Sequence, residues 1–132
     1  MRYECGFNPK LNIIEASTHG PADMAALLEM VRRIVELSGK ENSANVLIDH
    51  SGIDASSLTM QNVQTLSDTS VSLKDLFKME KCAQIAANDL QFGFARAWEM
   101  MVESDGLTGV ETRVFRNREA AIEWVKAGSG SA

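Results

Sequence analysis

The sequence predicts an α/β fold: a single domain with a mixed five-stranded sheet, made of an N-terminal hairpin plus parallel strands, flanked by four or five helices. Two observations predict it. Two strand-like runs near the N-terminus are joined by a short turn, and helical patterns then alternate with short apolar runs. Such alternation favours parallel pairing, because a helical crossover returns the chain to the same end of the sheet. With 132 residues and 45% hydrophobic content, one core suffices; we expect it within residues 1–127, followed by a flexible Gly/Ser tail at 128–132.

The chain opens with the expected hairpin. Residues 3–7 and 11–17 have strand-like patterns, and Pro9 sets the turn between them. The segment 20–23, Gly-Pro-Ala-Asp, predicts a helix start with proline in the first turn, and Gly39 predicts the end of this helix. Its apolar residues share one face at helical spacing: Met24, Leu27, Leu28, Val31, Ile34 and Val35.

The second strand-and-helix unit centres on a short apolar run. Residues 46–49 predict a strand that ends at Asp49, and a polar loop then leads to a second helix that begins near Ser57 or Thr59. The polar segment 68–72 has poor helix propensity. A short additional helix is therefore predicted after this break, starting at Ser72.

The last part of the chain repeats the alternation twice. Residues 82–87 predict a buried strand, followed by a third helix that we expect Asp89 to cap and Gly106 to end. Residues 110–115 alternate apolar with polar side chains, as a half-buried edge strand does. Asn117 then predicts the cap of a last helix.

Charge and hydropathy exclude several classes of function. The chain has 18 acidic and 13 basic residues and a formal net charge of −5, which disfavours binding to nucleic acid. No apolar run approaches the roughly 20 residues that a membrane span needs, and no signal-like segment opens the chain. We therefore expect a cytoplasmic protein without integral membrane association.

The reactive side chains are few and not spaced for chemistry. Cys5 and Cys82 lie in strand-like patterns outside any CxxC pair, which favours buried thiols over a disulfide or a zinc site. His19 and His50 have no metal-ligand spacing, so we expect no metal and no cofactor. The run Asp49-His50-Ser51 contains an acid, a base and a hydroxyl, but neighbours in an extended chain point in alternating directions. We expect no catalytic residues and no enzyme activity.

The polar loop after residues 46–49 is the first candidate binding surface. Loops at the carboxyl ends of parallel strands converge with helix N-termini and collect ligands there. Turn formation and helix capping are alternative roles for the acids and serines of this loop, and we prefer them to a magnesium cluster that would include Asp89. The partner-binding candidates are Asp49, Ser51, Asp54, Ser56 and Ser57.

Methionine and aromatic side chains form the second candidate, an apolar pocket between the second and third helices. Most of them are expected to belong to the ordinary core. Thioether and aromatic side chains can nevertheless adapt to an acyl chain or another apolar ligand. The pocket candidates are Met60, Phe77, Phe92, Phe94, Trp98 and Met101.

Three segments together resemble a known family. Residues 46–58 are similar to a pattern of a buried strand, an aspartate, a Ser-Gly turn and a serine pair that opens a helix. Residues 81–86 with 92–96 resemble the middle signature of small proteins of this length, and residues 114–125 resemble their strand-to-last-helix ending. On these segments the chain resembles the SpoIIAA-like group of the STAS superfamily, whose named members are anti-anti-sigma factors.

The resemblance implies a STAS-like fold and a regulatory role. In regulatory members, phosphorylation of a serine at the start of the second helix switches binding to an anti-sigma kinase. The matching positions are Ser56 and Ser57, between Ala55 and Leu58 where the family run has aspartate and glycine. We expect a non-enzymatic domain that binds a protein partner. The alternative, implied by a likeness to lipid-binding CRAL-TRIO domains, is a carrier or sensor of a small hydrophobic or lipid-like ligand. Exposed edge strands are also compatible with a homodimer.

Overall fold

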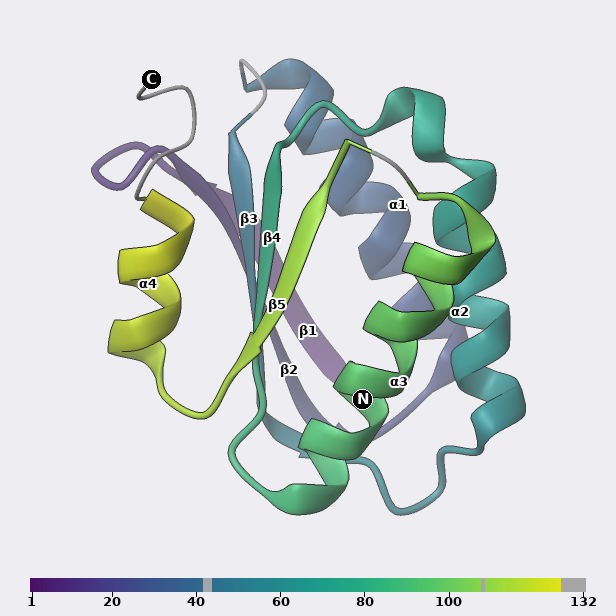
Figure 1. Cartoon of the computed structure of the whole chain (residues 1–132). Coiled ribbons are helices and arrows are strands. Elements are labelled where there is room, and N and C mark those ends of the chain that lie inside the picture. Colours follow the sequence, from purple (N-terminus) through teal and green to yellow (C-terminus); the bar gives the residue numbers. More distant parts are fainter. Residues whose placement is uncertain (42–43, 108, 127–132) are drawn as a thin grey trace.

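The computed structural model describes residues 1–41, 44–107 and 109–126 and confirms the predicted α/β fold (Figure 1). The expected tail at residues 128–132 lies outside the described residues. Strands and helices alternate after an opening hairpin, and a short 3-10 helix follows the second α-helix. The elements are β1 (Arg2–Asn8), β2 (Ile13–Pro21), α1 (Met24–Lys40), β3 (Asn45–Asp54), α2 (Met60–Ser72), η1 (Lys74–Leu76), β4 (Lys81–Ile85), α3 (Asp89–Asp105), β5 (Glu111–Phe115) and α4 (Arg118–Lys126).

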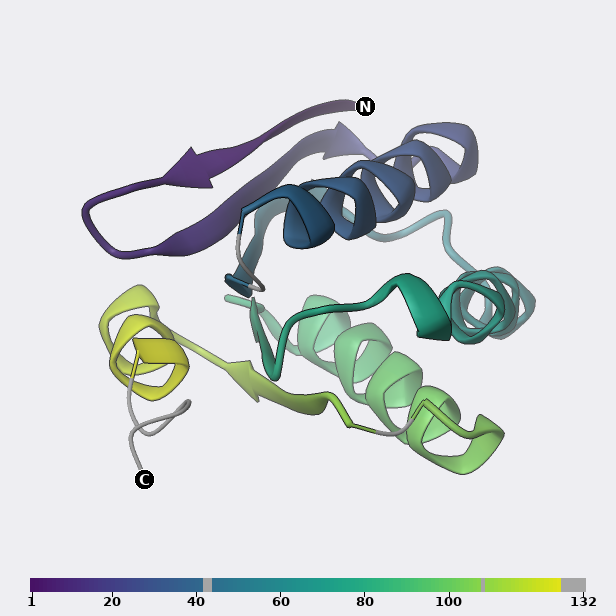
Figure 2. The ribbon, with the colours of Figure 1, turned by 90° about the horizontal axis from the view of Figure 1, so that it is seen from above.

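The sheet order follows the chain order. The strands lie as β1-β2-β3-β4-β5, with β1 antiparallel to β2 and the other pairs parallel. Each crossover moves the chain one strand further in the same direction, and right-handed crossovers of this kind place their helices on one face. Accordingly, α1, α2 and α3 cover one face and α4 covers the other, as Figures 1 and 2 show from two directions.

Alternating residues of the central strands build a core on each face of the sheet. Ile14 and Val46 belong to the larger core, beneath the face that α1 covers, and both are fully buried. Their chain neighbours Ile13 and Leu47 belong to the smaller core with α4, and each is 1% exposed. The helical side chains of the larger core are Leu27, Met30, Ile34 and Leu37.

Strands β2 and β3 are longer than the sequence predicted. Their parallel ladder continues to the pair Pro21–Asp54, so residues 50–54, expected as loop, belong to β3. Pro21 therefore ends a strand and does not stand in the first turn of α1. The first helix begins after Asp23, whose carboxylate accepts hydrogen bonds from the next backbone N–H groups, the shortest 2.9 Å long.

Two helix ends also differ from the expectation. Helix α1 continues past Gly39 to Lys40. Asn88, not Asp89, caps α3, because the backbone of Asn88 is still extended (φ −110°, ψ 169°) whereas Asp89 is the first residue of the helix. Gly106 ends α3 as predicted and takes the left-handed conformation, with φ 101°, that glycine adopts at low cost.

Candidate functional site

The two acids expected in the polar loop stabilise local turns. An Asp49 carboxylate oxygen accepts a hydrogen bond of 2.8 Å from the Ser51 backbone N–H. Asp54 does the same for Ser56, at 3.0 Å, and hydrogen bonding from Ser56 holds the pKa of Asp54 below its ordinary value. Asp49 lies in β3 as predicted, whereas Ser51 and Asp54, expected in the loop, also belong to β3, so the structure corrects their assignment. Their use in partner binding stays a prediction.

The serine pair lies before the start of α2 and does not cap it. Thr59 is the cap: its hydroxyl accepts a hydrogen bond of 3.1 Å from the Asn62 backbone N–H, and the Asn62 side chain accepts one of 3.0 Å from the Thr59 N–H. Ser56 and Ser57 are both exposed. The expected geometry, with a serine directly at the helix N-terminus, is therefore absent at these two residues.

An apolar cavity of about 90 Å³ lies between the sheet and helices α1, α2 and α3. Leu27, Val63 and Leu66 contribute to its wall from α1 and α2, and Phe94 and Trp98 contribute from α3. The two aromatic residues are thus pocket candidates that the structure brings to one cavity. The other lining residues include Ile48 and Ile53 of β3 and the polar residues His50, Gln84 and Gln91.

The remaining pocket candidates lie away from this cavity. Met60 is 51% exposed at the start of α2. Phe77 packs against the larger core, and the Arg116 guanidinium lies 4.2 Å from the centre of the Phe92 ring. Met101 is half-buried and does not line the cavity. The predicted single pocket between α2 and α3 therefore collects two of its six candidates.

A β-bulge lies at His50, which is one of the polar residues that line the cavity. Between the pairs Ser17–Asp49 and His19–Gly52, β3 has one residue more than β2, so His50 and Ser51 together face Thr18. The Thr18 hydroxyl and His50 Nδ1 are 2.8 Å apart, and Thr18 is fully buried. His50 follows Val46 and Ile48 at a spacing of two, so strand alternation places its imidazole on the helix-covered face, and the bulge brings Ile53 to the same face.

The buried environment keeps the His50 ring uncharged. Burial lowers the pKa of His50 from 6.5 to about 4, and the Asp49 charge and a hydrogen bond with Gln84 offset that effect only in part. The residue as a whole is half-buried and lines the cavity. At neutral pH the polar end of the cavity therefore has no formal charge.

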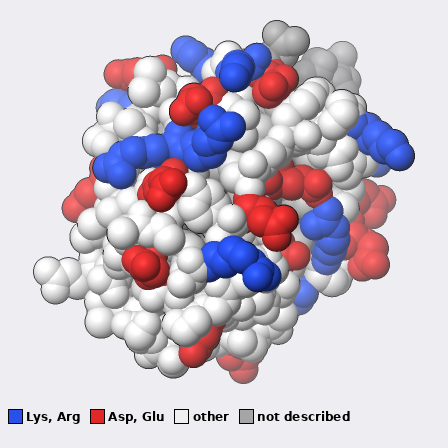
Figure 3. Space-filling model, turned by 180° about the vertical axis from the view of Figure 1, so that it is seen from behind, with Lys and Arg blue, Asp and Glu red and all other residues white. Residues whose placement is uncertain are grey.

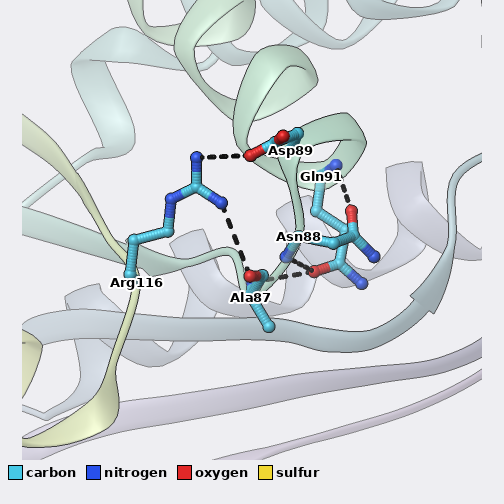
Figure 4. Close-up of polar contacts among 5 residues, drawn as sticks. All are labelled: Ala87, Asn88, Asp89, Gln91 and Arg116. Atoms are coloured by element: carbon cyan, nitrogen blue, oxygen red, sulfur yellow. Dashed lines mark hydrogen bonds and ion pairs between the residues drawn. The ribbon is translucent and has the colours of Figure 1, made fainter.

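Gln91 connects the start of α3 to the end of β3. Its carbonyl oxygen accepts hydrogen bonds from the backbone N–H groups of Ala87 and Asn88, at 2.8 and 3.1 Å. Its amide group donates to the carbonyl oxygens of Ile53 and Ser51, at 2.9 and 3.2 Å. Figure 4 shows the part of this network in the turn between β4 and α3. Gln91 thus ties the start of α3 to the end of β3, and both ends of its amide are engaged.

Gln84 differs from Gln91 because half of its amide has no partner. The residue is 5% exposed, and its Nε2 has no hydrogen-bond partner among the described residues. Most buried donors in proteins have a hydrogen-bond partner, because an unpaired donor loses its hydration on burial without gaining a bond in return. An unpaired donor on the wall of a cavity points to a group that the cavity could hold.

The acids of this sheet edge do not gather into a metal site. Arg116 donates a hydrogen bond of 3.0 Å to the Asp89 carboxylate and reaches the Ala87 carbonyl oxygen at 3.4 Å (Figure 4). Within the described ranges, no group of three or more His, Cys, Asp or Glu side chains could hold a metal ion. Asp49 and His50 are successive residues of a strand and point to opposite faces, so they do not form an acid–base pair with Ser51.

The surface is of mixed charge. In the view of Figure 3, acidic and basic side chains are interspersed, and no large region of one sign appears on that face. One contributing pair joins Arg33 to Glu36 at 2.8 Å, and another joins Arg118 to Glu15. In the part of the chain that the structure describes, no helix has the length and apolar character of a membrane span.

Comparison with known proteins places this chain in a family. The family model described as SpoIIAA-like matches residues 13–126, which is most of the chain. The chain belongs to the SpoIIAA-like family. A solved structure with a SpoIIAA-like fold, an uncharacterized protein of the DUF3478 family from Shewanella loihica PV-4, is similar with a TM-score of 0.56 and 17% identity, covering 93% of each chain. No protein with a curated description matches.

For this SpoIIAA-like chain the sequence reasoning missed the polar end of the cavity. His50 was assigned to a loop because the strand was expected to end at Asp49. A single amide, Gln84, within the apolar run 82–87 was the available signal, since an isolated polar residue in a buried strand needs a partner. Thr18 carried no signal, because its contact with His50 depends on pairing with a strand 32 residues away.

Proposed function

We propose that this chain is a non-enzymatic binding domain that holds a small, uncharged, largely apolar molecule in the cavity beneath α1, α2 and α3, as a carrier or sensor. The cavity itself is the observation that supports the proposal. Its wall is apolar except at one end, where His50, Gln84 and Gln91 meet. Ligand sites of small molecules typically have this composition, an apolar wall with a few polar groups that fix orientation.

The size of the cavity limits the ligand. The cavity has a volume of about 90 Å³. Apolar cavities of ~150 Å³ are known to take up benzene. Of the lipid-like ligands expected from the sequence, we therefore propose a compact molecule, because a long acyl chain would not fit in the cavity unless the helices moved apart.

The lining also limits the charge of the ligand. None of the lining residues is Asp, Glu, Lys or Arg, and His50 is neutral because burial lowers its pKa to about 4. A charged ligand would lose its hydration without gaining an opposite charge, which is strongly unfavourable. These features favour a neutral ligand.

Filling the cavity tests the proposal. Ala95 lines the cavity from α3, whereas Ala97 of the same helix does not. We expect methylenecyclopentane, a compact apolar probe, to produce saturable NMR shifts of cavity residues in the natural chain and in Ala97→Leu, but not in Ala95→Leu. Absence of saturable binding to the natural chain, or equal binding to Ala95→Leu, would contradict the proposal.

A second candidate is a protein partner bound at the exposed segment that runs from Asp54 to Met60. The observation that favours it is the side chain of Met60, 51% exposed beside the polar Ser56 and Ser57. Burial of Ala55, which is 4% exposed, and the Thr59 cap fix this segment in place. A partner surface held in one shape loses less entropy on binding.

The partner hypothesis predicts a local effect of substitution. Met60→Glu and Ser57→Asp should reduce the recovery of a specific partner from the source cells, whereas Met100→Glu, at another methionine that is 60% exposed, should not. Unchanged recovery with both segment variants would exclude this surface. Homodimer formation remains a separate prediction for the two sheet edges, β1 and β5.

A further inference from the structure

We infer that the Gln84 side-chain amide donates a hydrogen bond to the ligand, so that the cavity selects small neutral molecules with an acceptor oxygen, such as a ketone or lactone carbonyl, on an apolar body. This inference rests on the proposed function, ligand binding in the cavity. It adds the chemical class of the ligand and the residue that recognises it.

The position of Gln84 is the first support. Gln84 lines the cavity, is 5% exposed, and keeps Nε2 without a hydrogen-bond partner among the residues that the structure describes. Strand β4 is central, with β3 and β5 on its two sides, so its backbone is fixed by ladders. A donor on a rigid strand is pre-organised, and a ligand acceptor would pair it without a rearrangement of the backbone.

The neighbours of Gln84 supply the second support, because their hydrogen bonds are already used. His50 Nδ1 lies 2.8 Å from the Thr18 hydroxyl. Both ends of the Gln91 amide are engaged by the backbone of β3 and of the α3 cap. Of the His50, Gln84 and Gln91 side chains, Gln84 thus keeps its Nε2 donor for a ligand.

The orientation of the Gln84 amide determines that the ligand group it contacts is a hydrogen-bond acceptor. The hydrogen bond between Gln84 and His50 raises the pKa of His50, so it favours the protonated ring. A group that accepts a hydrogen bond from the ring has this effect, and the Gln84 amide oxygen therefore faces His50. Nε2 is then the end left for the cavity. With neutral His50 and no charged residue in the wall, a neutral carbonyl fits this end better than a carboxylate or an amine.

Two probes of equal shape test the inference. Cyclopentanone has a carbonyl oxygen where methylenecyclopentane has an exocyclic CH₂ group. The ratio of their dissociation constants therefore measures the contribution of the acceptor oxygen to binding. We expect the preference for the ketone to fall about five- to tenfold in Gln84→Met, the loss of one ordinary hydrogen bond. Gln64→Met, at an exposed glutamine of α2, should leave the ratio unchanged.

The natural chain offers a readout that needs no variant. Cyclopentanone should shift the Gln84 side-chain NH₂ protons downfield in NMR spectra, whereas methylenecyclopentane at equal occupancy should not. Equal ratios in the natural chain and Gln84→Met, unmoved NH₂ protons, or a preference for pyrrole, a donor without a carbonyl, would each overturn the inference while leaving cavity binding intact. Failure of all probes to bind would overturn the proposed function itself, and the inference with it.

Discussion

Lowering the pH from 7 to 5 is expected to destabilise this protein through His50, because the folded state keeps that ring neutral. Burial lowers the pKa of His50 to about 4, against 6.5 for the free side chain. Between these values the unfolded chain binds a proton that the folded chain does not, so the free energy of unfolding rises with pH. The contribution is complete above pH 6.5 and is lost as the pH falls toward 4.

The magnitude follows from the two pKa values of His50, which differ by about 2.5. At ~1.36 kcal/mol for each pKa unit, the limiting loss below pH 4 is about 3 kcal/mol. At pH 5 the unfolded ring is almost fully protonated and the folded ring is about one-tenth protonated, so the loss between pH 7 and pH 5 is about 2 kcal/mol. This interval lies above the ordinary pKa of carboxylates, ~4, which limits their contribution.

Urea unfolding followed by tryptophan fluorescence at pH 7 and pH 5 measures this loss. His50→Gln should remove about 2 kcal/mol of the difference between the two pH values, and His19→Gln, which leaves His50 in place, should retain it. An equal loss in the natural chain and in His50→Gln would refute the reasoning. The ring resonances of His50 in the natural chain give an independent check, because a titration midpoint near 6.5 would contradict a buried, neutral imidazole.

Three further predictions concern backbone fit, helix capping and thiol chemistry. Gly52→Ala should lower the free energy of unfolding by ~1–3 kcal/mol, because the new Cβ would lie 2.8 Å from the Thr18 carbonyl oxygen; urea unfolding that shows no loss would contradict this. Thr59→Ala should lower the free energy of unfolding by ~1 kcal/mol and Ser57→Ala by less than ~0.5 kcal/mol in the same assay. A larger loss in Ser57→Ala than in Thr59→Ala would indicate that Ser57 caps the helix. Burial raises the pKa of Cys82 to about 12, so a thiol reagent at pH 8 should label it only on unfolding; rapid labelling of Cys82 itself in the native chain, as distinct from the half-buried Cys5, would contradict the buried position.

The sequence predicted the fold because burial repeats with the period of each element. The apolar face of α1 and the run at residues 46–48 are consequences of that period, and both were found from the sequence. Element ends were less accurate. Strand β3 extends to Asp54 through pairing with β2, and a polar, glycine-containing stretch does not reveal such a ladder.

The cavity was predictable only on its apolar side. Phe94 and Trp98 repeat at helical spacing and face the sheet, so periodicity identified them. His50 and Gln84 lie on neighbouring parallel strands, and the pairing of Ile48 with Gln84 brings them together on one face. Local patterns carry no information about this pairing, because it depends on the relative register of two strands and not on one segment alone.

Native mass spectrometry of the protein isolated from its own cells, repeated after denaturation, tests the central claim most directly. If the cavity holds a small molecule, the native spectrum contains an added mass that disappears on denaturation and is missing from Ala95→Leu. A bare chain in both spectra would contradict the claim. So would an added mass that persists on denaturation, which would indicate covalent modification and direct attention to Ser56 and Ser57.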